Sequence, residues 1–462
     1  MVQTKLVRQR SNAAGQELKE TENSQRSEVR EGFGSTVKRH GAFAIRTFDT
    51  SHVFDGGARR WILTVPEGCD GNLIKQLTED CKPANMIVDY AGNPDNGGMC
   101  TVILTGTEAE IMEDLGACKN VLSESTLVEA DAEMHLIPDD ESTDEDESLL
   151  ESGAETTLWG LDRIDDRTTL DSDYTPPNTG KNVHVFVADT GILTTHADFE
   201  GRAIPTLEAL SAGRPKVCNP NDRNCAKDRQ GHGTHCAATI GGKKYGVAKE
   251  VKLHAVKVLS DRGSGSFSWF ITALDWVEQA RDKRPAVFSA SLGGRAVMAT
   301  VRQAIDDATN AGVMVVVAAG NDGRTQYPDA CSYTPAHVPS AITVGSMTRS
   351  DSRSIFSNYG SCLDIFAPGS DIKSAGIKSN TDSATLSGTS MACPHVSGAA
   401  ALLFEANPTK SVKDVERLLL VRATRDMVKD TKAKTPNLLL FVGKEGGPRP
   451  TPVATPKPTR AP

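Results

Sequence analysis

The chain has 462 residues, which leaves room for about three domains of ordinary size. Hydrophobic residues make up 38% and charged residues 24%, with 40 Gly and 23 Pro, and this composition excludes a coiled coil, a collagen-like rod and a wholly disordered chain. The longest apolar stretch, 313–319, is far shorter than the roughly 20 residues of a membrane helix, and no apolar signal core follows Met1. We therefore expect no membrane span.

The net charge of −9 comes from 51 Lys and Arg against 60 Asp and Glu. Residues 138–155 hold nine of the acids and no Lys or Arg, so this segment accounts for the whole excess. A balanced remainder gives no electrostatic reason to expect nucleic acid or an anionic membrane as the main partner. Because self-repelling carboxylates with few apolar neighbours cannot form a core, we interpret 138–156 as a solvated linker.

Residues 1–55 are polar and lack sustained periodicity, so we predict an unstructured leader there. Residues 56–137 predict a small α+β domain of β-α-β-β-α-β order. Thr107 and Glu110 form the S/T-x-x-E pattern that begins a helix. The expected strands are 61–65, 86–90, 101–105 and an extended run over 122–136, and the expected helices are 71–80 and 108–117.

Residues 157–445 alternate short apolar strands with amphipathic helices, the pattern of a parallel sheet covered on both faces. Strands are expected at 183–188 and 313–319, the latter after a helix that stops at Gly312. The fold class is therefore α/β with a doubly wound sheet. Residues 446–462 are rich in Pro and Thr and predict an extended tail.

Ten cysteines favour an oxidising compartment. None of them has the tandem CxxC spacing of a zinc site, so disulfides with one or two free thiols are the better interpretation. Four cysteines precede the acidic linker and allow three connectivities, among which the sequence does not choose. We expect Cys218 to pair with Cys225 from their closeness alone.

Three Gly-flanked polar motifs in the α/β domain carry Asp189, His232 and Ser390. Each residue alone is typical of a turn or a helix cap. Together they supply what acyl transfer needs: a nucleophile, a base to deprotonate it and a carboxylate to orient that base. Their order along the chain, Asp, His, Ser, separates them from α/β-hydrolases and from chymotrypsin-like enzymes.

These motifs make residues 157–430 resemble the subtilisin-like serine proteases, in particular the proteinase K and aqualysin subgroup. The resemblance implies that Asp189 orients the base, His232 is the general base and acid, and Ser390 is the nucleophile. It also implies that Asn321, in Ala-Ala-Gly-Asn-Asp, donates to the oxyanion together with the Ser390 backbone N–H. His235 and His395, beside the motifs, are expected to be structural.

The same resemblance implies a groove for an extended peptide and structural sites around it. Main-chain pairing in such a groove accepts many peptides, and its segments hold no acid to select a basic side chain, so we expect broad specificity with an apolar or aromatic preference. Ordinary Gly-rich loops are the alternative. The implied groove residues are Ser264, Gly265, Ser266, Ser291, Leu292, Gly293, Ala318, Ala319 and Gly320.

No cofactor is expected for catalysis, but a structural calcium ion is implied at the carbonyls of Pro339 and Ala341 and the carboxylate of Asp364. Asp364 is alternatively an ordinary strand-end residue. The resemblance further implies a disulfide between Cys331 and Cys362 and a buried free thiol at Cys236, and we expect Cys393 to be a buried thiol as well.

The domain over 56–137 resembles, in pattern more than in motif, the inhibitory prosegment of these proteases. It implies a zymogen that cuts itself between about His135 and Thr157 and whose prosegment strand stays in the groove. We expect a monomeric, secreted endopeptidase acting on proteins or peptides, with its own prosegment as inhibitor. A binding protein with a permanently docked prosegment is the second hypothesis, and a non-protease hydrolase is disfavoured by the motif order.

Overall fold

The structure is a computed structural model that describes residues 28–31, 35–40, 43–51, 53, 57–81, 86–117, 122–137, 158–168, 170–211, 213–281 and 284–444. The chain divides into two compact units. The first unit runs to Asn96 and resumes over Cys100–Ala132; the second comprises Gly97–Met99 and everything from Glu133 onward. The strand that follows the first domain in sequence therefore belongs to the second unit.

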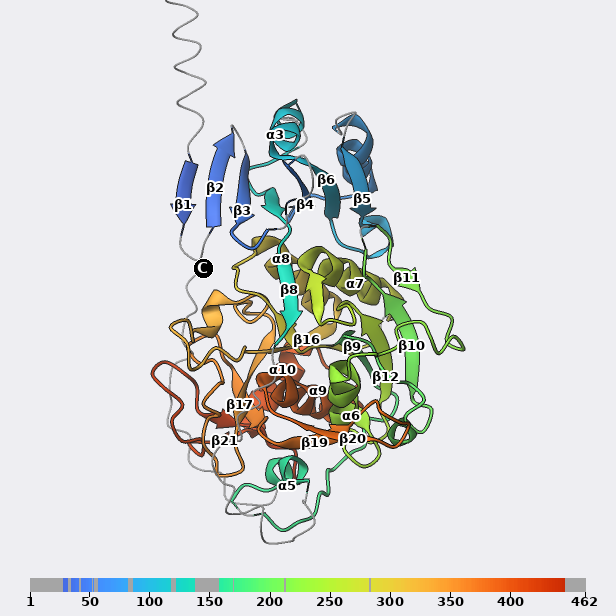
Figure 1. The fold of residues 1–462 in the computed structure, drawn as a ribbon, viewed down its shortest axis with the longest axis vertical. Helices are drawn as coiled ribbons and strands as arrows, with labels where there is room; N and C mark the ends of the chain where they lie inside the picture. Colours follow the sequence, from blue (N-terminus) through green and yellow to red (C-terminus); the bar gives the residue numbers. More distant parts are fainter. Residues whose placement is uncertain are drawn as a thin grey trace, which may run out of the picture. The chain divides into compact units, whose positions relative to one another are not determined.

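The first unit contains a seven-stranded sheet of order β1-β2-β3-β7-β4-β6-β5 (Figure 1). Val128, Ile45 and Trp61, from three neighbouring strands, are at most 1% exposed and lie in its core. Only the β3–β7 pair is parallel among the pairs of this sheet. The strands are β1 (Glu28–Glu31), β2 (Ser35–His40), β3 (Phe43–Phe48), β4 (Ala58–Thr64), β5 (Ile87–Ala91), β6 (Thr101–Thr107) and β7 (Leu127–Ala130).

From β4 onward, the elements follow the predicted β-α-β-β-α-β order: β4, α2 (Gly71–Lys75) continued by the π-helical turn η3 (Gln76–Asp80), β5, β6, α3 (Glu108–Ala117) and β7. A short 3-10 turn, η4 (Pro94–Asn96), precedes β6. The predicted cap of α3 is present, since Glu110 Oε2 accepts the Thr107 N–H at 2.7 Å and Thr107 Oγ1 accepts the Glu110 N–H at 3.3 Å.

The leader predicted over 1–55 is wrong for residues 28–31, 35–40 and 43–48, which form β1, β2 and β3. The apolar side chains there are few, yet Val37, Ile45 and Phe48 are each at most 7% exposed. Because Val37 pairs with Arg46 and Ile45 with Lys38, Ile45 lies on one face of the sheet and Val37 and Phe48 lie on the other, so the few apolar residues are divided between two faces. Residues 1–27, the acidic linker over 138–156 and the tail over 446–462 lie outside the described residues.

The second unit is built on a ten-stranded sheet of order β11-β10-β12-β9-β14-β16-β17-β18-β22-β21. Its strands from β10 to β22 run parallel, and β11 and β21 close the two edges in the antiparallel sense. The strands are β9 (His184–Asp189), β10 (Ala203–Glu208), β11 (Lys216–Val217), β12 (Lys252–Lys257), β14 (Ala286–Ala290), β16 (Val313–Ala318), β17 (Ile342–Met347), β18 (Ile365–Pro368), β21 (Thr424–Arg425) and β22 (Leu438–Leu439).

Helices lie on both sides of this sheet, with α7 and α8 on one and α6, α9 and α10 on the other (Figure 1). The all-buried strands β14, β16 and β17 agree with a sheet covered on both faces. The predicted α/β fold is confirmed. The helices are α5 (Trp159–Asp165), α6 (His232–Gly241), α7 (Phe267–Ala280), α8 (Ala299–Ala311), α9 (Thr389–Ala406) and α10 (Val412–Arg422), with 3-10 turns η5 (Ala197–Phe199) and η6 (Ala330–Ser332).

Two small sheets complete the unit. One pairs β19 (Ile372–Ala375) with β20 (Ser383–Leu386). The other has three strands, with β8 (Glu133–Leu136) between β13 (Ser264–Ser266) and β15 (Leu292–Gly293), antiparallel to both. Among the helices within the described ranges, none combines the length and the apolar character that a bilayer crossing requires.

Candidate active site

The three residues of the Asp, His, Ser motifs come from three elements of the parallel-sheet unit. Asp189 ends β9, His232 begins α6, and Ser390 is the second residue of α9. All three are buried, with exposures of 0%, 1% and 0%. This arrangement follows from the fold, because parallel sheets gather functional groups where strands end and helices begin.

Asp189 and His232 are in direct contact. The two Asp189 carboxylate oxygens lie 2.8 and 2.9 Å from His232 Nδ1, and Oδ1 also accepts the Thr190 N–H at 2.7 Å. Burial opposes protonation of the ring, but the negative charge of Asp189 outweighs it and raises the pKa of His232 well above its usual value. The carboxylate thus holds the ring by Nδ1 and directs Nε2, which has no hydrogen-bond partner among the described residues, away from itself.

A second buried carboxylate, which the sequence analysis did not single out, holds the turn that precedes His232. Asp228 is 1% exposed, and its two oxygens accept five hydrogen bonds at 2.7–2.9 Å. One donor is Thr190 Oγ1, beside Asp189, and the others are Gln230 N, Gly231 N, Thr234 N and Thr234 Oγ1. Asp228 therefore couples the end of β9 to the start of α6.

Ser390 lies against two backbone carbonyls. Its Oγ is 3.4 Å from the carbonyl oxygen of Ser291 and 3.5 Å from that of Ile137. The Ser390 carbonyl accepts hydrogen bonds from Ser291 Oγ at 2.9 Å and from the Cys236 thiol at 3.4 Å. These contacts anchor the first turn of α9 to the segment that leads into β15 and to α6.

Asn321 follows β16 and faces the start of α9. Its Oδ1 accepts the N–H and the hydroxyl of Thr389, both at 2.9 Å, which leaves the donor end of the amide, Nδ2, on the other side. Gly388 lets this amide come close, because a Cβ at that position would lie only 3.0 Å from Nδ2. The amide donor predicted for an oxyanion hole is thus fixed next to Ser390.

Asn358 forms hydrogen bonds to the loop that carries Asn321. The sequence did not point to Asn358. Its side chain donates to the Ala319 carbonyl and accepts the Asp322 N–H, both at 2.9 Å, and its own N–H donates to the Gly320 carbonyl at 2.9 Å. Gly320 has φ +102°, and a Cβ there would lie 2.4 Å from Asn358 Nδ2. No local signal marks Asn358, since its partners lie 36–39 residues away.

The predicted peptide-pairing segments do bind an extended strand, and that strand belongs to the chain itself. Residues Ser264–Ser266 form β13 and Leu292–Gly293 form β15, and β8 lies between them. His135 pairs with Ser264 on one side and Gly293 on the other. The third predicted wall, 318–320, ends β16 and turns into the Asn321 loop, where the Gly320 N–H donates to Thr389 Oγ1 at 3.1 Å.

His235 and His395 are buried beside the motifs and bind backbone carbonyls, of Ile372 and Met391 respectively. Burial lowers the pKa of His235 to about 3 and that of His395 to about 4, so both rings are neutral in the folded protein. This agrees with the structural role expected for them. Cys236 and Cys393 are buried free thiols, and burial raises the pKa of both.

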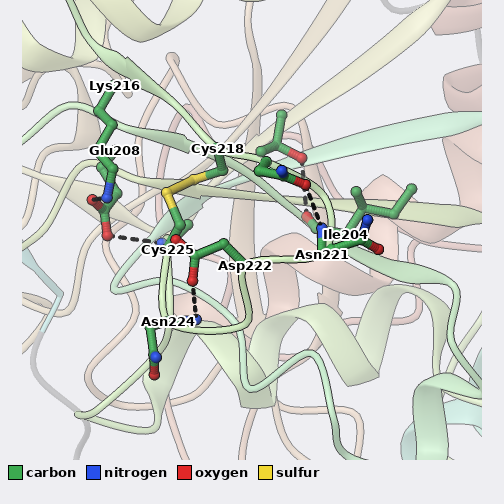
Figure 2. The surroundings of a disulfide bond; sticks show 11 residues. Ile204, Glu208, Lys216, Cys218, Asn221, Asp222, Asn224 and Cys225 are labelled. Carbon is green, nitrogen blue, oxygen red and sulfur yellow. Dashed lines mark hydrogen bonds and ion pairs between the residues drawn. A yellow bond between two sulfur atoms is a disulfide. The ribbon is translucent and has the colours of Figure 1, made fainter.

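Disulfides join Cys218 to Cys225 and Cys331 to Cys362, as predicted. In the first unit Cys69 pairs with Cys100, which selects among the connectivities that the sequence left open. Figure 2 shows the Cys218–Cys225 bridge closing a short loop in which Asp222 Oδ1 accepts the Asn224 N–H at 3.0 Å. Glu208 accepts the Ala226 N–H at 2.8 Å and thereby ties the end of this loop to β10.

Asp364, the carboxylate of the predicted calcium set, accepts the Thr343 N–H at 2.9 Å through Oδ2. Thr343 lies two residues after Ala341, another member of that set. A group that sequence reasoning missed is formed by Asp162, Asp166 and Asp171, whose carboxylate oxygens lie within 4.8 Å of one another.

Residues 180–443 match the profile of the subtilase family. The chain belongs to the subtilase family. It is similar to an extracellular serine proteinase of Thermus sp. (strain Rt41A), with 52% identity over 284 residues, 61% of this chain and 65% of that protein. It is also similar to alkaline serine exoprotease A of Vibrio alginolyticus, with 45% identity over 302 residues, 64% of this chain and 53% of that protein.

A solved structure of a cold-adapted subtilisin-like serine proteinase has a TM-score of 0.56 and 42% sequence identity, and the match covers 63% of this chain and all of that one. The resemblance drawn from the three motifs is therefore confirmed at the level of family and fold. The chain spans 65% and 53% of the lengths of the two curated relatives.

Proposed function

We propose that the protein is a subtilisin-like serine endopeptidase that is made as a zymogen. One observation carries the proposal: beside a buried Asp189–His232 pair, the Ser390 hydroxyl lies 3.5 Å from the carbonyl oxygen of Ile137, the residue that directly follows the strand bound in the groove. Relatives named as serine proteinases add to it.

We propose the following roles for these residues. Ser390 Oγ attacks the carbonyl carbon of the scissile bond while His232 Nε2 takes its proton and then gives it to the leaving nitrogen. Asp189 holds the Nδ1–H and favours the charged ring that forms. The negative oxygen of the tetrahedral intermediate accepts from Asn321 Nδ2 and from the Ser390 N–H, and one such donor contributes about 3 kcal/mol to lowering the barrier.

The groove supports broad specificity. β13 and β15 pair with the main chain of β8, and such pairing carries no side-chain selectivity. The strand itself offers apolar side chains to the unit, since Met134 and Ile137 are 0% and 7% exposed. We therefore expect a preference for apolar or aromatic residues in protein and peptide substrates.

Residues 56–137 act in this proposal as an intramolecular inhibitor. The supporting observation is β8, which joins the small domain in sequence to the groove of the peptidase unit. Cleavage between about His135 and Thr157 then separates prosegment from enzyme. The disulfides and the extracellular Thermus relative support secretion of the enzyme. We expect the enzyme to be a monomer.

We also propose a structural calcium ion held by the carbonyls of Pro339 and Ala341 and the carboxylate of Asp364, with no cofactor in the reaction itself. Two features support this set: hard oxygen donors suit calcium, and the Ala341 N–H bonds back to the Val338 carbonyl, folding the 338–341 segment into a turn. The ion would add stability. Raising calcium from chelated to millimolar should then raise the melting temperature of the protein but not that of an Asp364→Asn variant.

The occupied groove favours a second candidate, a binding protein whose prosegment never leaves. The wild-type chain and a Ser390→Ala variant separate the two functions when both are incubated and then assayed on casein. Chain cleavage and casein hydrolysis in the wild type alone support the endopeptidase. A folded wild-type chain that remains intact and inactive, like the variant, supports the binding protein instead.

A further inference from the structure

The register of β8 identifies the bond that faces Ser390. Leu136 pairs with Leu292 and His135 with Gly293, so the next step of this antiparallel ladder puts Ile137 opposite Ser291. The Ser390 hydroxyl lies between the carbonyl oxygens of those same two residues, at 3.5 and 3.4 Å. The pairing and the contact thus agree that Ile137 contributes the carbonyl presented to Ser390.

The residue after Ile137 is Pro138, so the presented bond is a tertiary amide. Hydrolysis would require Ser390 Oγ to bond to the Ile137 carbonyl carbon, and the Pro138 nitrogen to leave with a proton from His232. To accept that proton, the nitrogen must turn its lone pair toward Nε2. An ordinary amide nitrogen does so by moving one hydrogen, whereas the Pro138 nitrogen must move its ring carbon Cδ.

The site leaves little room for that movement, because Ser390 and His232 are at most 1% exposed. Side chains of β8 also fix the strand in place. Met134, opposite Gly265, is fully buried, and a Cβ on Gly265 would lie 2.8 Å from the Met134 methyl carbon. Leu136 lies beside Gly263, whose carbonyl accepts the Leu136 N–H at 2.8 Å. A Cβ on Gly263 would lie 2.0 Å from a Leu136 methyl carbon.

We propose that the chain inhibits itself with a segment that it cannot cut in this register, because the bond it presents to Ser390 is Ile137–Pro138. This inference rests on the proposed peptidase function and refines its maturation step. The maturation cut then falls at another bond of the acidic linker, and Ile137–Pro138 stays intact while β8 occupies the groove.

Replacing the proline tests the proposal. Full-length wild type, Pro138→Ala and Asp139→Ala are incubated, and fragment masses and new N-termini are determined over time. Pro138→Ala should release a fragment ending at Ile137, at a rate above wild type by about 10²-fold or more, the contribution of a general acid to such a step. Asp139→Ala keeps the tertiary amide and should behave like wild type. Adding Ser390→Ala to Pro138→Ala should abolish the new cut.

Two results would overturn the inference while leaving the peptidase intact: a wild-type product that begins at Pro138, or Ser390-dependent cleavage of Pro138→Ala only at other bonds. If none of the folded chains shows any Ser390-dependent cleavage of itself or of casein, the proposed function fails and this inference fails with it. The two failures are therefore distinguishable.

Discussion

Two groups of carboxylates in the second unit differ in the partners that surround them. Around His232, Asp189 faces an imidazole and Asp228 accepts five hydrogen bonds. Near the start of the unit, Asp162, Asp165 and Asp166 crowd together, and each has one oxygen that is buried without a partner among the described residues. In the first group both oxygens of each carboxylate have partners, whereas in the second group only Asp162 Oδ1 and Asp165 Oδ2 accept backbone N–H bonds and the other oxygen of each carboxylate has no partner among the described residues.

The different surroundings of the two groups change the pKa values of the residues in them. Desolvation is the largest cause of the raised pKa of Asp162, Asp165 and Asp166, and neighbouring carboxylates raise it further; for Asp165 the pKa reaches about 6. At His232 the paired charge instead favours the charged ring. A buried carboxylate thus orients a base when it has matched donors, and weakens the fold when it has not.

Removing the charge of Asp189 should have the largest effect. Asp189→Asn keeps the shape but offers an amide to His232 Nδ1, which disfavours the tautomer that has its proton there. We expect kcat to fall by about 10⁴-fold with little loss of stability. The assay is peptide hydrolysis by the processed enzyme, with the exposed Asp222→Asn as a matched control. A fall below tenfold would contradict the role given to Asp189.

Removing the charge of Asp228 should mainly lower the stability of the folded protein. Asp228→Asn cannot accept all five donors, because one of its two oxygens becomes an NH₂ group. Buried donors left without a charged acceptor cost about 1–3 kcal/mol each, so we expect the unfolding free energy to fall by about 3 kcal/mol. Urea unfolding in a Ser390→Ala background measures it without self-digestion. An unchanged unfolding free energy would contradict the proposal that Asp228 couples the end of β9 to the start of α6.

Putting a carboxylate in place of the Asn358 amide extends the comparison to the loop of Asn321. Asn358→Asp loses the donor to the Ala319 carbonyl and sets a carboxylate oxygen against it. A misplaced Asn321 should lower kcat by up to about 10²-fold with KM little changed. If the effect runs through Asn321, Asn321→Leu and Asn358→Asp will not be additive in the double variant. Additive losses would show that Asn358 acts independently.

The smallest predicted effect is on the pH dependence of stability. Because the folded pKa of Asp165, about 6, exceeds its ordinary 3.8, the folded state binds this proton more tightly. Its contribution to stability is therefore full below about pH 4 and is lost as the pH rises through about 6. Asp165→Asn should raise the melting temperature at pH 8 but not at pH 4, measured with chelator so that no cation neutralises the group. An equal shift at both pH values would exclude this titration.

The sequence predicted the candidate site residues that lie in short, recognisable motifs. Asp189 ends a strand, His232 begins a helix and Ser390 is the second residue of a helix, positions where Gly-flanked patterns are diagnostic, and Asn321 lies in a matching motif. It did not predict Asp228 or Asn358, because their function is to bond residues that are near in space and ordinary in sequence. It also missed β1 to β3, because the few buried apolar residues there are divided between two faces of the sheet and give no clear period.

The peptide-binding groove was predicted only in part. The peptide-pairing segments were identified from resemblance, but the strand that fills them and its register could not be, because register is set by contacts between residues more than 120 positions apart. Pro138 is visible in the sequence, but its effect on cleavage could be inferred only once the structure placed the Ile137 carbonyl beside Ser390.

The most direct test of the account is covalent labelling of the nucleophile. Full-length protein is treated with a fluorophosphonate before and after a Glu-specific protease has cut the acidic linker, and the modified residue is located by peptide mapping. We predict one adduct, on Ser390, that forms faster once the linker is cut and that Asp189→Asn suppresses. A folded, cut protein that leaves Ser390 unlabelled would contradict the assignment of Ser390 as the activated nucleophile.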